Sequence, residues 1–539
     1  MKADGDRWSR RDVLRLGGAG AMAAVGMGAL APDEAMAAET GAGWHSRLVY
    51  PGSDGRLVYR VDNAGNRIPD FSWAGYRNGE VALPNVDVVL EIGPVSGDNT
   101  THIQQALDKV ASRPLSEAGF RGALRLKPGT YPVSGTLHLR HSGVVLRGSG
   151  KWGDPAVDTV IIGTGSGSVE TVIKVGGGVA NWNSQKPGTR TDIVTGLVRV
   201  GSRSFQVADA SNLRVGDNLI ITHPHTAAWG AAIDGGGTLK GGQGEPWPVG
   251  SRPIIYSRYI QAIDGNMIRV CAPVFNHLDR ALSQSYAHVW TQAGLIRNVG
   301  VENLRVTMGS PPAEDENHQM SCVILDGVED AWVKDCQLLQ FSYSGVLCRR
   351  ATRVTVQSVR ASHPRSKLVG ERRYNFQAAL LSQQVLFRDL WSEQARHAFV
   401  SNGATTTSGC VWADGYNKNG YTESGGHQRW THGLLFDNIK EIDTRSDKAW
   451  VLNLHNRGHI SNHGWSSAHS VLWNCTVDSG RRACVQRPPT AQNYAIGTKG
   501  GASGVNWWSN IPAGHIEGTN SAGLQPASLY AAQLADRLG

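Results

Sequence analysis

The side chains best suited to acid–base chemistry lie in one part of the chain, between about Asp315 and Trp465. Histidine and tyrosine can accept or give a proton, and the planar guanidinium of arginine binds a carboxylate through two parallel hydrogen bonds. This combination indicates proton abstraction beside a carboxylate group. Three short segments carry it, at 372–376 (RRYNF), 396–400 (RHAFV) and 424–430 (SGGHQRW).

Proton abstraction of this kind needs a cation for the carboxylate, a base for the proton and an acid for the leaving oxygen. It is the chemistry of β-elimination from a uronate polymer. We also expect histidine and tryptophan to bind sugars, since a flat indole ring can stack on a sugar ring. The predicted residues are Arg373, Arg396 and Arg429 for the carboxylate, His397 and His427 as bases, Lys367 as a weaker base, Tyr374 as acid, and His318, Trp430, His463 and Trp465 for the sugars.

Each of these residues also has a purely structural explanation. His397 could bond a main-chain carbonyl in the core, and Tyr374 could pack on Phe376, two positions along the same strand face. Arg396 could pair with Glu393, and a lysine is most often a solvated surface charge. The residue types alone do not separate these roles from catalysis.

Two other functions stay open at this point. A glycoside hydrolase needs two carboxyl groups across the cleaved bond, and a third possibility is a non-catalytic carbohydrate-binding or adhesion protein. The many titratable groups favour an enzyme over a passive surface. Carboxyl groups for hydrolysis are available at Asp315, Glu316, Glu371, Glu393 and Glu423.

The elements that must position these residues are short strands that recur along the chain. The segment 300–306 (GVENLRV) has an echo at 327–333 (GVEDAWV), 27 positions later. Similar units follow at 351–356, 384–389, 434–439 and 471–475. A repeat of this length is typical of a solenoid, in which equivalent positions stack about 4.8 Å apart. Stacking would bring histidine, arginine and tyrosine from successive turns into one groove.

The order of the elements predicts an all-β chain, a right-handed parallel β-helix over residues 100–539. Ile103, Ala106, Leu107 and Val110 recur at helical spacing and predict a short helix that caps the open end of the core. Residues 38–99 are expected to be rich in loops. A β-rich insertion is expected at about 194–275, where the spacing of the short units is lost.

These segments resemble the pectate-lyase-like superfamily of parallel β-helix proteins. The resemblance begins at 122–148, which is similar to the opening turns of that fold, and it reaches the RRY-F, RH-FV, GGH-RW and HGW segments of an exported bacterial branch. It implies an acidic residue after His397 and a proline before His427. This chain has Ala398 and Gly426 there.

The N-terminus predicts export. Residues 9–15 (SRRDVLR) form a twin-arginine pattern, an apolar run follows, and 35–37 (AMA) offers a cleavage site, so residues 1–37 resemble a Tat signal peptide. Without it we expect a secreted or periplasmic protein with no stable membrane anchor. The net charge of +8 suits a polysaccharide partner that is acidic, and no nucleic-acid motif is seen.

The sequence predicts no cofactor, although calcium is left open because oxygen ligands need not follow a motif. The cysteines form no CxxC pair, which argues against a zinc ribbon. Their odd number leaves at least one thiol unpaired within the chain, and buried thiols are as compatible with the pattern as disulfides. They are Cys271, Cys322, Cys336, Cys348, Cys410, Cys475 and Cys484.

Overall fold

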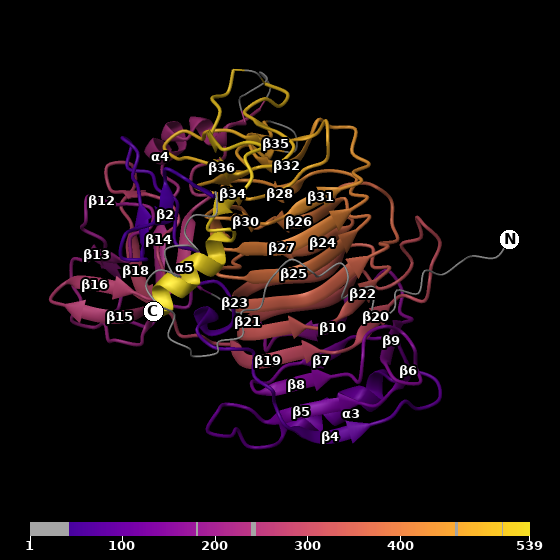
Figure 1. The fold of residues 1–539 in the computed structure, drawn as a ribbon. Coiled ribbons are helices and arrows are strands. Elements are labelled where there is room, and N and C mark those ends of the chain that lie inside the picture. The colour runs from indigo at the N-terminus through magenta and orange to yellow at the C-terminus, as the bar shows by residue number, and fades with distance from the viewer. Residues whose placement is uncertain (1–42, 179–181, 239–243, 459–461, 509) are drawn as a thin grey trace, which may run out of the picture. The chain divides into compact units, whose positions relative to one another are not determined.

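The structure, a computed structural model, describes residues 43–178, 182–238, 244–458, 462–508 and 510–539. The predicted export signal at 1–37 lies outside the described residues. Parallel strands stack turn upon turn through most of the remaining chain (Figure 1). They form a right-handed parallel β-helix, as predicted.

Sheet 1 is the longest stack of the β-helix. Each of its strands pairs in parallel with the equivalent strands one turn before and one turn after. Its strands are β4 (Val88–Ile92), β5 (Gly122–Leu126), β8 (Val144–Arg147), β19 (Ile296–Glu302), β21 (Ser321–Lys334), β23 (Ser344–Ser362), β25 (Leu386–Glu393), β27 (Val411–Lys418), β30 (Leu435–Asp437), β34 (Val471–Trp473), β36 (Tyr494–Ile496) and β38 (His515–Glu517).

Two further sheets complete each turn, because long strands such as β21 and β23 bend from one sheet into the next. Sheet 2 contains β7 (Leu137–Leu139), β10 (Thr171–Val175), the first parts of β21 and β23, β24 (Tyr374–Ala378), β26 (His397–Ser401), β28 (Ser424–Gly426), β32 (Trp450–Leu454), β35 (Arg482–Val485) and β37 (Ala502–Ser503). Sheet 3 contains β6 (Gly129–Val133), β9 (Thr159–Gly163), β20 (Arg305–Thr307), β22 (Gln337–Leu339), the ends of β23, β25 and β27, and β31 (Lys440–Ile442).

The core of the β-helix consists of side chains stacked in register along sheet 1. Val333, Val356, Phe387, Trp412 and Phe436 are neighbours on successive turns. The rings of Phe387 and Trp412 lie 5.2 Å apart and those of Trp412 and Phe436 5.0 Å apart, nearly parallel. Each large ring is covered by its neighbours above and below, so the stack itself supplies much of the core.

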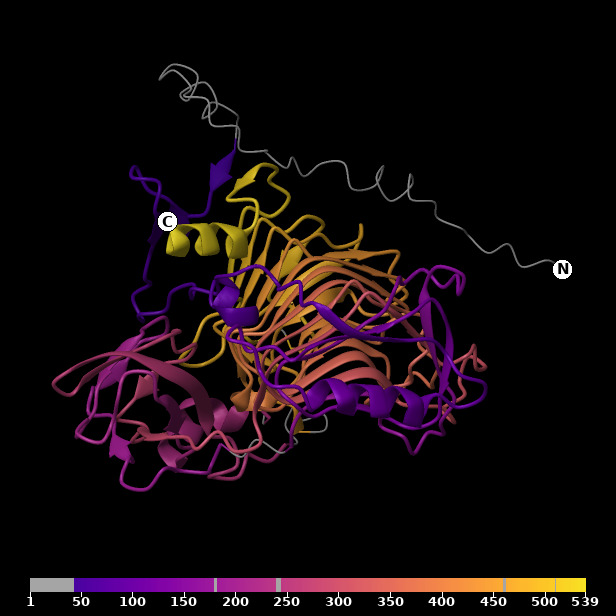
Figure 2. The ribbon, with the colours of Figure 1, turned by 90° about the horizontal axis from the view of Figure 1, so that it is seen from below.

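A helix closes the N-terminal end of this core, as predicted. In α3 (Thr100–Ala111) the side chains of Ile103, Ala106, Leu107 and Val110 are buried. Figure 2 shows α3 lying across the strands of the first turns. The strand β4 precedes the helix, so the winding begins at Val88 rather than at residue 100.

The antiparallel insertion extends further than 194–275, because its last strand returns to pair with both its first strand and its centre. Its six-stranded sheet has the order β11-β18-β14-β15-β16-β13. The elements are β11 (Thr191–Asp192), β12 (Leu197–Val198), β13 (Ser204–Gln206), β14 (Asn218–His223), α4 (Ala227–Ala232), η2 (Asp234–Gly236), β15 (Ile254–Asp264), β16 (Met267–Val270), β17 (Leu278–Asp279) and β18 (Tyr286–Val289).

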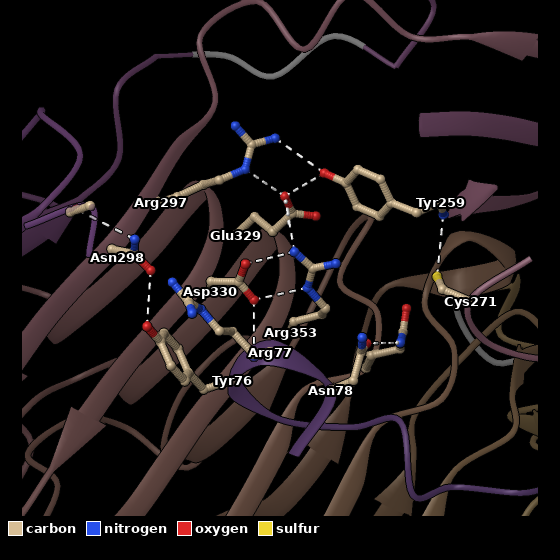
Figure 3. Close-up of polar contacts among 12 residues, drawn as sticks. Tyr76, Arg77, Asn78, Tyr259, Cys271, Arg297, Asn298, Glu329, Asp330 and Arg353 are labelled. Carbon is tan, nitrogen blue, oxygen red and sulfur yellow. Dashed lines mark hydrogen bonds and ion pairs between the residues drawn. The ribbon is translucent and has the colours of Figure 1, made fainter. Parts of the chain in front are cut away.

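Charged side chains tie the insertion to sheet 1, and we call them the Glu329 seam: Tyr259, Arg297, Glu329, Asp330 and Arg353 (Figure 3). The Tyr259 hydroxyl of β15 donates to Glu329 Oε2 at 2.6 Å, and Arg297 Nε lies 2.7 Å from the same oxygen. Arg353 binds Asp330 through two bonds of 2.8 and 2.6 Å. Burial alone would raise the pKa of Glu329, but Arg353 and Arg297 outweigh it and lower that pKa.

The chain ends pack on the outside of sheet 1. In α5 (Leu529–Leu538) the Tyr530 hydroxyl donates to the carbonyl of Ala74, and the main-chain N–H of Tyr530 donates to the Asp437 carboxylate. All seven cysteines are buried free thiols. No helix among the described residues is long and apolar enough to cross a membrane. The remaining short elements are β1 (Trp44–His45), β2 (Val49–Pro51), β3 (Leu57–Tyr59), η1 (Tyr76–Gly79), η3 (Ala404–Thr406), β29 (Thr431–His432), β33 (Ser467–Ala468) and β39 (Leu524–Gln525).

Candidate active site

Sheet 2 brings three of the predicted residues together from successive turns. Tyr374 begins β24 and His397 begins β26, where the two are register partners, and His427 directly follows β28. The ring centroids of Tyr374 and His397 lie 5.0 Å apart, those of His397 and His427 4.7 Å, and those of Tyr374 and His427 5.6 Å. We call these three residues the Tyr–His cluster.

His397 is held as a neutral imidazole with a bare nitrogen. Its Nδ1 lies 2.6 Å from the carbonyl oxygen of Glu423, so Nδ1 must carry the proton and donate it. Its Nε2 is then the lone-pair atom, and it is buried with no hydrogen-bond partner among the described residues. Burial lowers the pKa of His397 to about 3; Glu423 opposes this shift, and Arg396 adds to it. The ring is therefore uncharged at neutral pH.

The other histidine of the cluster has the opposite tautomer. Arg457 Nη1 lies 2.6 Å from His427 Nδ1. Since a guanidinium can only donate, His427 Nδ1 accepts and Nε2 carries the proton. That Nε2 lies 3.5 Å from the Tyr374 hydroxyl and 3.3 Å from His463 Nε2. Burial lowers the pKa of His427 well below its ordinary value, and the nearby Arg457 lowers it further.

Glu423 holds both histidines of the cluster in place. Its carboxylate is fully buried, 2.5 Å from Lys448 Nζ and 3.6 Å from Arg457 Nη2. Burial would raise the pKa of Glu423, but Arg457 and Lys448 together lower it below its ordinary value. The group therefore stays ionised, and it holds the guanidinium that fixes the tautomer of His427.

A cavity of about 230 Å³ opens beside the cluster. Arg396 connects the two, because it lines the cavity and its Nη1 donates to the Tyr374 hydroxyl at 3.2 Å. The main-chain N–H of Glu371 also donates to this hydroxyl, at 3.3 Å, so the segment before β24 lies over it. The cavity wall consists of Leu368, Arg396, Tyr421, Thr422, Arg445 and Asp447.

The two positions that depart from the pectate-lyase-like pattern have local explanations. Ala398 is fully buried in the hydrophobic core, so a carboxylate there would not orient His397. The Glu423 carbonyl and the Thr422 hydroxyl, 3.0 Å from Nδ1, do this instead. At Gly426 a Cβ would lie 2.8 Å from the Ser466 carbonyl oxygen, so the close approach of the next turn favours glycine.

Three other predicted residues do not line the cavity, and two of them hold main chain together. Arg373 is buried and its Nη2 donates to the carbonyls of Ser366 and Ala313, which occupies the group expected to bind a carboxylate. His318 bonds the carbonyls of Gln319, Asp315 and Arg365 and is also buried. Lys367 is exposed, and its side chain does not line the cavity although Leu368 beside it does.

Of the four remaining predicted residues, the two tryptophans face the insertion rather than the cavity. Trp430 is fully buried, and its Nε1 donates to Asn276 at 2.9 Å. Trp465 is also buried, and a Cβ on Gly237 of the insertion would lie within 2.6 Å of its ring. Stacking on a sugar is therefore not available to either indole. Arg429 Nε donates to the Asn462 carbonyl, whereas His463 does meet the cluster at His427.

Three cations of the site were not predicted from the sequence: Lys448 and Arg457, which pair with Glu423, and Arg445, which lines the cavity. Lys448 stands 25 positions after Glu423, and Arg457 stands 30 positions after His427. These separations are one turn each but differ by five positions, so no fixed count along the chain would have found them. Among the described residues, no group of three or more His, Cys, Asp or Glu side chains is arranged to hold a metal ion.

No protein-family model and no curated protein matches the chain. Among solved structures it is similar to the tailspike protein gp49 from Pseudomonas phage LKA1 (13% identity over 75% of this chain and 64% of that one, TM-score 0.41). It is similar in the same degree to the Gp54 tailspike of Acinetobacter baumannii bacteriophage AP22 (13%, 79% and 64%, TM-score 0.41). It is also similar to the polygalacturonase from Erwinia carotovora ssp. carotovora (10%, 81% and 98%, TM-score 0.40).

The chain thus spans 64% of the length of each of these two tailspikes. These likenesses are too slight to indicate an activity, which has to be inferred from the chain's own side chains. What the sheet pairing itself defines is the class of protein, a right-handed parallel β-helix.

Proposed function

We propose that this protein cleaves an acidic polysaccharide by β-elimination at the Tyr–His cluster. One observation carries the proposal. The buried Nε2 of His397 has no hydrogen-bond partner among the described residues, so its lone pair is free. The His397 ring contacts that of Tyr374, and the Tyr374 hydroxyl accepts a hydrogen bond from Arg396 in the cavity wall. A neutral base, a hydroxyl and a carboxylate-binding cation are the three groups that this elimination needs.

The proposed reaction starts when a uronate carboxylate binds Arg396 and Arg445, which makes the proton on C5 more acidic. His397 Nε2 takes this proton. The electron pair forms the C4–C5 double bond while the bond from C4 to the glycosidic oxygen breaks. Tyr374 gives its proton to the leaving oxygen, and transfer of the proton from His397 to the phenolate then restores the site.

Binding of the substrate also prepares the base. Arg396 is one of the cations that lower the pKa of His397. A carboxylate paired with Arg396 offsets that repulsion and makes the imidazole easier to protonate. Because Tyr374 and His397 are buried, the segment 366–371 must move aside as the sugar enters. Leu368 of this segment lines the cavity, and the Glu371 N–H lies on the Tyr374 hydroxyl.

Hydrolysis fits the site less well than elimination. A hydrolase needs one carboxyl group that donates a proton and a second that activates water or attacks the sugar. Two carboxyl groups lie at this site: Asp447 lines the cavity, and Glu423 is fully buried between Lys448 and Arg457. Glu423 is held ionised, so it does not supply the proton-donating acid that a hydrolase pairs with a second carboxyl group.

The test is a panel of sodium polygalacturonate, sodium alginate, carboxyl-reduced polygalacturonate and dextran. We expect the ultraviolet absorbance of an unsaturated uronate with at least one of the two acidic polymers, and none with the reduced polymer or dextran. Reducing ends without that absorbance would indicate hydrolysis and refute the proposal. An Arg396→Ala variant should raise the KM for the cleaved polymer.

We also propose that the chain is exported by the twin-arginine route, which rests on the sequence pattern at 9–15. Replacing both Arg10 and Arg11 by lysine should leave the protein in the cytoplasm of a Tat-competent bacterial host. Export of this double variant at the normal level would contradict the proposal.

A further inference from the structure

An aromatic group adjoins the Tyr–His cluster on the turns nearer the C-terminus. Trp450 begins β32, His455 follows this strand, and Trp507 lies beyond β37. The Trp507 ring stacks on His455 at 5.7 Å and meets Trp450 edge to face at 4.9 Å. Trp508 closes the group with its ring 5.6 Å from that of Trp507. We call these four residues the Trp507 platform.

The indole of Trp507 is open to solvent although its neighbours are not. It is 45% exposed, whereas Trp450 is 6% exposed and His455 is fully buried. One side of the ring is covered by His455, which stacks on it. An indole that packs on one side and stays exposed otherwise is suited to stack on the apolar face of a sugar ring.

Cations join the platform to the active site. Lys448 Nζ lies 5.5 Å from the centre of the Trp507 ring, and the same amine lies 2.5 Å from Glu423. Glu423 in turn accepts the bond from His397 Nδ1 through its carbonyl. Arg482, the register partner of Trp450, donates to the Val505 carbonyl beside Trp507. The positive charge around the ring matches a polymer that carries carboxylates.

The spacing fixes where on the polymer the ring would act. Trp507 stands at the level of β32, which is two turns from β26, where His397 lies. Two turns of a parallel stack span about 10 Å. A disaccharide held at the cluster does not reach the ring, whereas a hexasaccharide that runs along sheet 2 does.

We propose that Trp507 is a binding platform for a sugar ring of a negatively charged polysaccharide, about two turns along the helix from the bond that is cleaved. The inference rests on the proposed function, because it takes the Tyr–His cluster as the place of cleavage. It adds a direction to it: the polymer lies along the helix axis and extends toward the C-terminal turns.

The experiment compares Trp507→Ala, Trp507→Phe and Trp152→Ala. Trp152 is the matched control, since it is 49% exposed beside Lys151 and Arg360 but is not linked to the cluster. Binding of polygalacturonate and alginate hexasaccharides and disaccharides is measured by calorimetry in a His397→Ala background, so that no cleavage occurs. Thermal unfolding checks that each variant is folded.

We expect Trp507→Ala to weaken hexasaccharide binding about three- to tenfold, Trp507→Phe to weaken it less, and disaccharide binding to stay unchanged. Unchanged hexasaccharide binding, an equal loss in Trp152→Ala, or no binding of either hexasaccharide by the parent would overturn the platform. Cleavage is measured separately with His397 intact. Cleavage that persists with a normal KM in Trp507→Ala refutes the platform alone, and binding that depends on Trp507 without any cleavage refutes the lyase alone.

Discussion

The Glu329 seam and the Tyr–His cluster are two buried polar groups on neighbouring sheets, and they differ in how their atoms are satisfied. In the seam, Glu329 and Asp330 are paired by Arg297, Arg353 and Tyr259 (Figure 3). In the cluster, Nε2 of His397 has no partner among the described residues. A buried polar atom without a protein partner costs stability, and one beside a cavity is a candidate for binding a ligand.

The largest effect is expected when the unsatisfied group is removed. His397→Ala should lower kcat by about a thousandfold, because a general base contributes typically 10²–10⁴. The melting temperature should fall less than in His432→Ala, because only Nδ1 of His397 is bonded, whereas both ring nitrogens of His432 are. Steady-state kinetics by product absorbance and calorimetric unfolding measure the two quantities.

His432→Ala is the matched control for this prediction. His432 is another fully buried histidine, but its Nε2 is bonded to the Tyr256 hydroxyl at 2.8 Å. This variant should lose stability and retain its activity at low temperature. Equal losses of kcat in both variants would mean that His397 only supports the structure.

Breaking the seam should give the reverse result. Glu329→Ala leaves Arg297 and Arg353 without their shared carboxylate, and loss of one partner of a buried pair costs about 3–5 kcal/mol of unfolding free energy. Denaturant unfolding measures this loss, and kcat below the melting temperature should stay unchanged. Arg47→Ala, at an exposed pair with Glu517, should cost far less. A loss of kcat without loss of stability would place the seam in the active site.

A smaller effect on turnover is expected at the hydroxyl of the cluster. Tyr374→Phe removes the proposed acid but keeps the ring that contacts both histidines. We expect kcat to fall about a hundredfold with KM little changed, which is the lower range for a proton donor. A uronate that carries a better leaving group on O4, such as a 4-O-nitrophenyl ether, should recover part of the rate. No recovery would exclude Tyr374 as the acid.

A third buried group sharpens the comparison through pH. Glu441 is fully buried, accepts from Asn417 at 2.6 Å, and burial raises its pKa to about 8. A folded pKa above the unfolded value of about 4.3 means that the folded state holds the proton longer. The contribution of Glu441 to the unfolding free energy should therefore fall as pH rises from about 4 to 8. Glu441→Gln should remove this contribution, with little difference from the parent near pH 4. Parallel curves for the two proteins in calorimetric scans would contradict the assignment.

Much of the architecture could be read from the sequence because each turn repeats the same requirement. The segments 300–306 and 327–333 do lie in strands of successive turns, but β19 and β21 pair with an offset of 32 positions (Gly300 with Trp332) rather than the 27 of the echo. The helical spacing of Ile103 and Leu107 correctly predicted the capping helix, because the open end of the core is the apolar surface on which such a helix can bury its apolar face. Both patterns depend on residues close together in the sequence, so they predict the type of element that forms.

The convergence of Tyr374, His397 and His427 also followed from the sequence, because residues one turn apart stack. Only the tertiary structure showed that Arg457 and Lys448 complete the site. The loops between turns differ in length, so the register of β32 against β28 cannot be counted along the chain. Only the structure, too, showed that the insertion buries Trp430. Which face of a turn stays exposed depends on what packs against it. Here the packing joins Trp430 to Asn276, 154 positions apart, which no local sequence pattern reveals.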